Sequence, residues 1–289
     1  MIGFDVIREA ADVLGESPLW CVRRERLFWV DIRAPALQSC DANGAEYRRW
    51  TMPSAIGSFA FTGGDHLIVA LRDGFHRFDP SSGRLAPIAL VERDRPHHRM
   101  NEGKCDPQGR FVAGSMNDSV REATGLLYQL GPGSTCEVVK RGFAVPNSLC
   151  WSPEGDRVYF ADTEARVIVR YRYDAAGALL EPAAFVDLRS GAGRPDGATI
   201  DAEGCLWSAE VASGCVVRYT PDGRELARFD LPVSRVTSLT FGGPGHATLY
   251  VTTSSYKLTS AQRAEEPLAG ALFAASPGVQ GLPAAVFAG

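Results

Sequence analysis

Residues 154–162, EGDRVYFAD, join a glycine-containing turn to a short apolar run, and this unit occurs six times along the chain. The apolar run is too short for a typical helix and is rich in β-branched and aromatic residues, so a β-strand is predicted. The copies follow one another at intervals of 40 to 48 residues. They are RRERLFWVD (23–31), GGDHLIVAL (63–71), PQGRFVAGS (107–115), EGDRVYFAD (154–162), AEGCLWSAE (202–210) and GHATLYVTT (245–253).

Each copy lies between two further apolar strands, as SLCWS (148–152) and VIVRYRYD (167–174) flank the copy at 154–162. A period near 45 residues with three or four strands per unit is typical of a β-propeller. A solenoid of helix pairs has a similar period, but the alternating pattern and the frequent turns oppose helices. We therefore predict an all-β, six-bladed β-propeller, with residues 1–289 as one domain. FDVIREA (4–10) is expected to add an outer strand to the last blade and close the ring.

Composition excludes several classes of partner. The chain is 45% hydrophobic and 22% charged, with a net charge of -4 and no block of like charge. Nucleic acids and anionic membranes favour basic surfaces, so neither is expected as a partner. The N-terminus lacks the features of a signal peptide, and the seven cysteines have no CxxC spacing, so free thiols in a cytoplasmic protein are expected. A monomer or a weak homo-oligomer is the expected state.

Polar residues recur at one position of the repeat. In a propeller the first strand of every blade lines the central channel and begins at the same face. Counting back 10 to 12 residues from each copy's first apolar residue places six positions at the channel mouth: Glu16, Ile56, Asn101, Asn147, Asp196 and Thr237. Any one of the acids or amides could be an ordinary turn residue. Glu16, Asn147 and Asp196 in matching register instead predict a site for one divalent ion, because hard oxygen donors suit Ca²⁺, Mg²⁺ or Mn²⁺ and tolerate Zn²⁺ or Fe²⁺.

The connectivity also predicts what surrounds this mouth. Two polar loops, 116–125 and 254–270, should border it and could cover a substrate. Arg99 lies two residues before Asn101 and should share its face of the strand, where it could hold a hydroxyl-rich or anionic ligand. Three acids that end the returning strands are expected to have structural roles: Asp31, Asp162 and Glu210.

Two histidines provide an alternative general base. His97 and His98 titrate near neutrality, but they lie three or four residues outside the register. Exposed loop positions are therefore expected for them. The sequence contains no GxSxG, Walker, HExxH or GxGxxG motif.

These residues resemble the gluconolactonase and regucalcin family, also called the senescence marker protein family, of six-bladed propellers. The resemblance rests on LGESPLW (14–20), RMNEGKCDPQGRFVAGSM (99–116), PNSLCWSPEG (146–155) and RPDGATIDAEGCLW (194–207), and it spans almost the whole chain. It implies a divalent-metal sugar lactonase of carbohydrate metabolism. Ca²⁺, Zn²⁺, Mn²⁺ or Fe²⁺ would be the cofactor, and the lactone of a five- or six-carbon sugar acid the substrate.

The resemblance also implies residue roles. Glu16, Asn147 and Asp196 match the family's metal ligands, and Asp196 matches its proposed general base. Arg99 and Asn101 match residues that contact the sugar lactone, and Glu122 matches a sugar-binding acid. The family's usual Asn-Asp-Gly-Lys is Asn101-Glu102-Gly103-Lys104 here, so the longer Glu102 side chain is expected to alter the pocket.

Two other functions remain open at this stage. A calcium ion in the channel could simply hold the blades together in a regulatory or structural protein. An aryl-ester or organophosphate hydrolase could also use a polarising metal on the same scaffold. The Arg99 and Asn101 pair favours a hydroxylated substrate.

Overall fold

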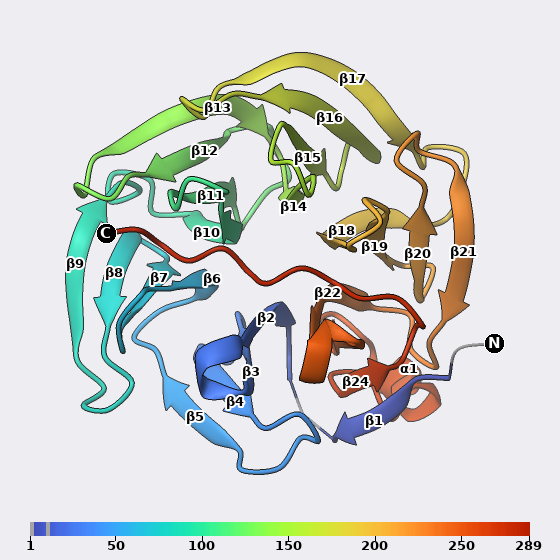
Figure 1. Cartoon of the computed structure of the whole chain (residues 1–289). Helices are drawn as coiled ribbons and strands as arrows, with labels where there is room; N and C mark the ends of the chain where they lie inside the picture. The colour runs from blue at the N-terminus through green and yellow to red at the C-terminus, as the bar shows by residue number, and fades with distance from the viewer. Residues whose placement is uncertain (1–2, 10–11) are drawn as a thin grey trace.

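The computed structural model describes residues 3–9 and 12–289 and arranges six four-stranded antiparallel sheets around a central channel (Figure 1). The predicted six-bladed β-propeller is therefore confirmed. Blades one to three are β2 (Gly15–Cys21), β3 (Arg26–Asp31), β4 (Ala36–Cys40) and β5 (Arg48–Thr51); β6 (Ile56–Phe61), β7 (Leu67–Leu71), β8 (Gly74–Phe78) and β9 (Leu85–Leu90); and β10 (His98–Cys105), β11 (Phe111–Asn117), β12 (Gly125–Leu130) and β13 (Cys136–Phe143). Blades four and five are β14 (Pro146–Trp151), β15 (Arg157–Asp162), β16 (Val167–Tyr173) and β17 (Leu179–Asp187); and β18 (Arg194–Ile200), β19 (Leu206–Val211), β20 (Cys215–Tyr219) and β21 (Glu225–Asp230).

The sixth blade joins the two ends of the chain. It contains β22 (Val236–Gly242), β23 (Thr248–Thr253), β24 (Leu272–Ala275) and, as its outer strand, β1 (Asp5–Arg8), which pairs antiparallel with β24. The expected outer strand within residues 4–10 is thus confirmed, although Ala10 lies outside the described residues. Because β1 pairs with β24, the outer edge of β24 is covered by a strand from the other end of the chain.

Apolar side chains pack between neighbouring blades rather than in one central core. Between blades five and six, the Trp207 ring stacks on Phe229 with centroids 5.5 Å apart and meets Phe241 edge-on at 5.6 Å. Blades one and two are joined in the same way by Phe28, which packs edge-on against Phe61 at 5.4 Å. Such aromatic contacts add to the burial of apolar area. They hold the six inner strands at fixed positions around the channel.

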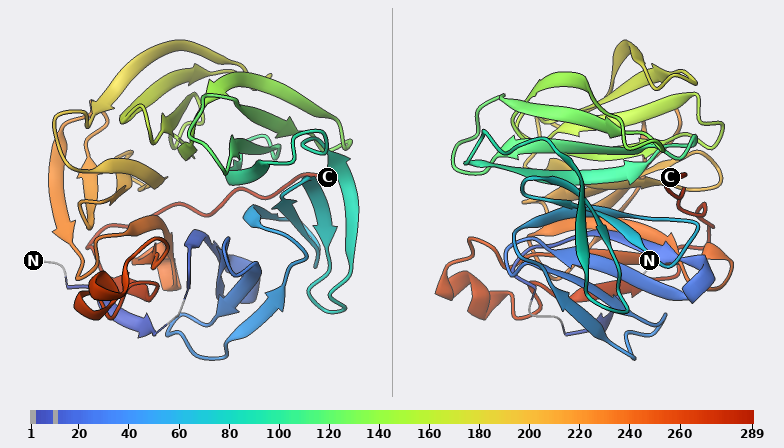
Figure 2. Two further views of the ribbon diagram at one scale, coloured as in Figure 1. Left: turned by 180° about the vertical axis from the view of Figure 1, so that it is seen from behind. Right: turned by 90° about the vertical axis from the view of Figure 1, so that its left-hand side faces the viewer.

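The two faces of the propeller differ (Figure 2). The segment that contains the short helix α1 (Ser260–Glu265) projects from one face, and the C-terminal segment runs along the other. That segment crosses the end of the channel (Figure 1), where the Phe287 N–H donates to Phe61 O at 2.7 Å and the Ala288 N–H to Gly109 O at 2.9 Å. One end of the channel is therefore covered by the chain's own last residues.

All seven cysteines are free thiols, as expected. Among the described residues, no helix has the length and apolar character needed to cross a membrane.

Candidate metal centre and active site

A β-bulge interrupts each inner strand at the position that the repeat placed at the channel mouth. In every blade, the pairing of the inner strand with its neighbour shifts register at or beside the predicted position: Glu16, Ile56, Asn101, Asn147, Asp196 and Thr237. A bulge frees residues from the regular alternation and redirects their side chains. Five of the six line one pocket, and Ile56 is instead buried in the core between blades one and two.

The inner strands approach one another so closely that side-chain size is restricted beside the site. A Cβ atom at Gly197 would lie 2.1 Å from Ser238 Oγ of the next blade. Ser17 and Ser148 follow Glu16 and Asn147 with positive φ angles of 48° and 58°. Their hydroxyls donate to backbone oxygens of the next inner strand, at 3.0 Å for Ser17 and 2.6 Å for Ser148. These contacts fix the metal-ligand candidates against neighbouring blades, at the cost of an uncommon backbone conformation.

A chain of hydrogen bonds connects the polar residues at the floor of the pocket. Arg99 donates to Asn101 Oδ1 at 2.6 Å, and Asn101 Nδ2 donates to Asn147 Oδ1 at 2.9 Å. Asn147 Nδ2 then donates to Asp196 Oδ1 at 2.7 Å and to Thr163 Oγ1 at 2.9 Å. All five residues are buried. Residues separated by almost a hundred positions in the sequence therefore form one network.

Two carboxylates, Glu16 and Asp196, meet at this floor. Burial, followed by the nearby charge of Glu102, raises the pKa of Glu16 to about 8. Burial, followed by the charge of Glu16, raises the pKa of Asp196 well above its usual range. Across the described residues, no arginine or lysine forms an ion pair with either carboxylate. Two buried, mutually repelling carboxylates indicate a site that a cation would complete.

The donor set fits a divalent ion. Glu16 and Asp196 supply carboxylate oxygens and Asn147 an amide oxygen, which are hard ligands of the kind Ca²⁺ and Mn²⁺ bind. In the observed arrangement the amide nitrogen of Asn147 faces Asp196. Among the described residues, Asn147 Oδ1 accepts only from Asn101 Nδ2, so it keeps a lone pair with which it could bind the ion.

The pocket has a second layer above the floor. The residues two positions before the register residues line it in five blades: Leu14, Arg99, Val145, Arg194 and Arg235. Side chains at i and i−2 share a face of a strand, so the two layers lie one above the other. The cavity has a volume of ≈ 250 Å³, which suits a small polar molecule.

Both predicted loops border this pocket. Arg121 from 116–125 and Tyr256 from 254–270 contribute to its lining, together with Arg33. Arg33 forms two hydrogen bonds of 2.6 Å to Asp118, and its guanidinium lies 4.3 Å from the centre of the Tyr256 ring. The loops thus place aromatic and cationic groups at the entrance.

The structure shows where four further acids named from the sequence lie and what they contact. Asp31 and Asp162 accept hydrogen bonds from the backbone N–H groups of the segment before each inner strand, and Glu210 accepts one from Tyr219. Glu122 is exposed and lies outside the described residues that line the pocket. Its neighbour Arg121 lines the pocket instead.

Two expectations need correction. His97 is exposed as expected, but His98 is only 6% exposed, with Nε2 3.2 Å from Thr124 Oγ1. His98 lies on β10, where its side chain packs away from the described pocket. Glu102 does not reshape that pocket either, because its Oε2 accepts from Leu149 N at 2.9 Å and Oε1 lies 3.2 Å from Lys104 Nζ, outside the described lining.

Sequence reasoning missed four lining arginines and the hydroxyl of Thr163. The missed arginines are Arg33, Arg121, Arg194 and Arg235. A signal for two of them was present, because arginine stands two residues before the register position in three blades. Thr163 carries no such signal, since its contact with Asn147 depends on the returning strand of blade four.

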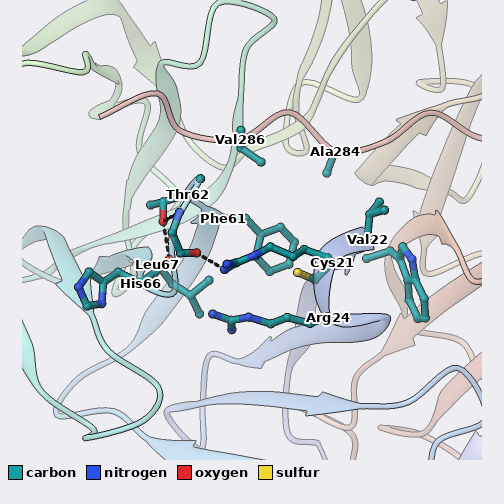
Figure 3. A pocket seen from close by; sticks show the side chains of 13 residues that line it. Cys21, Val22, Arg24, Phe61, Thr62, His66, Leu67, Ala284 and Val286 are labelled. Carbon is teal, nitrogen blue, oxygen red and sulfur yellow. Dashed lines mark hydrogen bonds between the residues drawn. The ribbon is translucent and has the colours of Figure 1, made fainter.

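Other candidate sites lie at the covered end of the channel. One of them is a cavity of ≈ 290 Å³. Figure 3 shows that Ala284 and Val286 of the C-terminal segment lie above Cys21 and Phe61 in its lining. Its lining is largely apolar and contains no carboxylate. Asp201, Glu203 and Cys205 also cluster near this end, but Asp201 accepts hydrogen bonds from Trp207 and Arg218 and from its own turn. Asp201 therefore acts as a turn residue.

Comparison with known proteins adds independent information. Residues 14–255 match the family described as the SMP-30/Gluconolactonase/LRE-like region. The chain is 35% identical to the L-arabinolactonase of Azospirillum brasilense, over 98% of this chain and 95% of that protein. It is also 35% identical to the 6-deoxy-6-sulfogluconolactonase of Pseudomonas putida, over 98% of each chain. The solved structure of the calcium-binding protein regucalcin of Agrobacterium tumefaciens superposes with a TM-score of 0.95 at 27% identity, covering 99% of this chain and 97% of that one.

Proposed function

The chain belongs to the SMP-30/gluconolactonase/LRE-like family, and we propose that it hydrolyses the lactone of a five- or six-carbon sugar acid with one divalent ion. The supporting observation is the convergence of Glu16, Asn147 and Asp196 at the floor of a pocket whose walls carry hydrogen-bond donors. A structural ion would not need such a wall. The wall therefore favours catalysis over a purely structural or regulatory site.

Glu16, Asn147 and Asp196 would hold the ion. When bound, a divalent cation would polarise the lactone carbonyl and stabilise negative charge on its oxygen. Ca²⁺, Zn²⁺, Mn²⁺ and Fe²⁺ are the candidate ions to be tested. Calcium binding is named for the regucalcin relative.

Asp196 is the proposed general base. Only one of its oxygens is engaged by Asn147, which leaves the other able to accept a proton from water. The water oxygen then bonds to the carbonyl carbon and the bond from that carbon to the ring oxygen breaks. The ring oxygen takes up the proton that Asp196 accepted and becomes a hydroxyl group, so the base is regenerated, one water molecule is consumed and the open-chain acid is formed.

Arg99 and Asn101 are proposed to contact the sugar. Asp118 accepts from Arg99 Nε at 3.0 Å, and Nη1 donates to Asn101 and to Met100 O. These bonds fix the guanidinium at the pocket wall, and none of the described residues accepts from Nη2. Arg99 therefore retains one donor group for a substrate hydroxyl, without loss of side-chain freedom on binding.

A lactone panel tests this function. Purified protein would be assayed by acid release with γ- and δ-lactones of five- and six-carbon sugar acids. The assays would be run before and after chelation and with each ion added back. Metal-dependent hydrolysis of at least one lactone is expected. If chelation and readdition leave every rate at that of buffer alone, the proposal is wrong.

A further inference from the structure

The pocket contains more positive than negative charge. Five arginines line it, Arg33, Arg99, Arg121, Arg194 and Arg235, against three carboxylates, Glu16, Glu164 and Asp196. If Glu16 and Asp196 hold a divalent ion, as proposed above, neither is available to neutralise an arginine. The excess of positive charge then lies above the reacting end of the substrate.

Four of the arginines share two acids. Arg33 and Arg99 both bond to Asp118, with nitrogen–oxygen distances of 2.6 Å and 3.0 Å. Arg194 bonds to Glu164 at 2.6 Å, and Arg121 lies 3.8 Å from the same side chain. Each acid therefore serves two guanidinium groups, which remain partly able to bind another anion.

Arg235 forms no ion pair with any acid in the described part of the chain. Among the described residues, none accepts a hydrogen bond from its guanidinium nitrogens, and its Nε is buried without a partner. Its backbone is nevertheless fixed, because Arg235 O accepts from Ser254 N at 3.0 Å. A buried, unpartnered donor on a charged side chain is costly, so it indicates a ligand group that is absent from the protein itself.

The position of Arg235 shows which part of a substrate it would contact. Arg235 and Arg194 precede Thr237 and Asp196 by two residues, so both belong to the layer above the floor. β18, which begins at Arg194, and β22, which begins directly after Arg235, pack side by side. Between them the rim carries Val211 and Ala212, which add no charge and little bulk.

We propose that the substrate lactone carries a negatively charged group, such as a carboxylate, sulfonate or phosphate, on the end of the sugar away from the ester, and that Arg235 binds this group with Arg194 beside it. This inference rests on the proposed lactonase function and specifies its substrate class. An arginine fork matches the planar or tetrahedral oxygens of such groups and is weakly hydrated, so it can bind them in a partly buried pocket.

The test compares neutral and charged lactones of equal carbon number. One neutral aldonolactone is assayed beside analogues whose terminal carbon carries a carboxylate, a sulfonate or a phosphate, each with the preferred ion present. For wild-type protein, kcat/KM for at least one charged lactone should exceed that of the neutral lactone by tenfold or more. The analogue with the largest ratio identifies the anion.

Charge-removing variants assign this preference to a residue. Arg235→Gln should lower the charged-to-neutral ratio at least tenfold, because a charge-assisted contact is lost. Arg224→Gln, which removes the same charge from an exposed turn at the other end of blade five, should leave the ratio within twofold. Circular dichroism and urea unfolding of both variants would show that each is folded.

The outcomes separate the two proposals. Turnover of the neutral lactone at a rate equal to or above all charged analogues would overturn the inference and leave the lactonase function standing. Arg235→Gln could instead leave the charged-to-neutral ratio of kcat/KM unchanged and weaken inhibition by the acid formed from the neutral lactone. That result would show that Arg235 binds the product carboxylate, and it would also overturn the inference. If no lactone were hydrolysed, both proposals would be wrong.

Discussion

Replacing Thr163 with valine tests whether the hydroxyl behind the candidate metal site positions Asn147. Thr163 Oγ1 accepts from Asn147 Nδ2 at 2.9 Å and donates to Pro195 O at 2.8 Å, and the residue is 7% exposed. Valine has nearly the same shape, so Thr163→Val removes two buried hydrogen bonds and creates little cavity. At about 0.5–1.5 kcal/mol for each bond, the free energy of unfolding should fall by about 2 kcal/mol.

Thr163→Val should also weaken the binding of the metal ion, although it hardly changes the shape of the side chain. Without Thr163 Oγ1, the Asn147 amide loses a partner that fixes its orientation. Loss of such a supporting hydrogen bond weakens metal affinity by about 10–100-fold. Affinity would be measured by competition with a chelator for Ca²⁺ and Mn²⁺, and stability by urea unfolding of the metal-free protein.

Thr163→Ser is the matched control, because it keeps the hydroxyl and removes only a methyl group. Its metal affinity should remain within about threefold of wild type, as for a change that leaves the supporting hydrogen bond intact. If Thr163→Val binds the ion as tightly as Thr163→Ser, the hydroxyl does not position Asn147 and the reasoning is refuted.

Three further predictions follow from contacts elsewhere. Asp196→Ala should abolish lactone hydrolysis while the circular dichroism spectrum stays β-like, and retained turnover would remove Asp196 from the mechanism. Phe287→Ala should lower the free energy of unfolding by about 3–5 kcal/mol, because the ring is 4% exposed in the core beside blade three; a change below 1 kcal/mol in urea unfolding would contradict this packing. Burial raises the pKa of Asp118, but the charges and hydrogen bonds of Arg99 and Arg33 outweigh it and lower this pKa from 3.8 to about 2. Asp118 therefore stabilises the fold above pH 4 and loses its contribution as the pH falls toward 2. The stability difference between wild type and Asp118→Asn should therefore narrow by about 2 kcal/mol between pH 5 and pH 2, and a constant difference in acid unfolding would contradict this.

The repeat made the inner strands predictable before the structure was known. Counting from an apolar residue such as Leu206 placed Asp196 at the start of an inner strand, and the bulge in β18 lies at that position. The count works because the turn between the first two strands has nearly the same length, four or five residues, in every blade. The same count could not show that Ile56 enters the core while the other five positions face one pocket.

The expectations for His98 and Glu102 were wrong because of how β10 begins and where its bulge lies. His98 was placed in a loop because it lies outside the register of inner-strand residues, but β10 begins at His98 and its side chain is buried. Glu102 was expected to alter the pocket because it is longer than the aspartate usual in the family, yet the bulge directs it to the backbone N–H of Leu149 on the next blade. The sequence along one strand does not show that His98 is buried or that Glu102 points to the next blade, because both depend on contacts with other segments.

The sequence by itself determined the six blades, their strand order and the alignment of Glu16, Asn147 and Asp196, because these depend on a period repeated along the chain. Only the tertiary structure decided which side chains neutralise one another across blades. Asp118 forms ion pairs with two arginines and Thr163 accepts a hydrogen bond from Asn147, whereas no acid within residues 3–9 and 12–289 pairs with Arg235. The physical reason is that distances between blades depend on how the six sheets pack around the channel, and hydrogen bonds and ion pairs depend on differences of less than 1 Å.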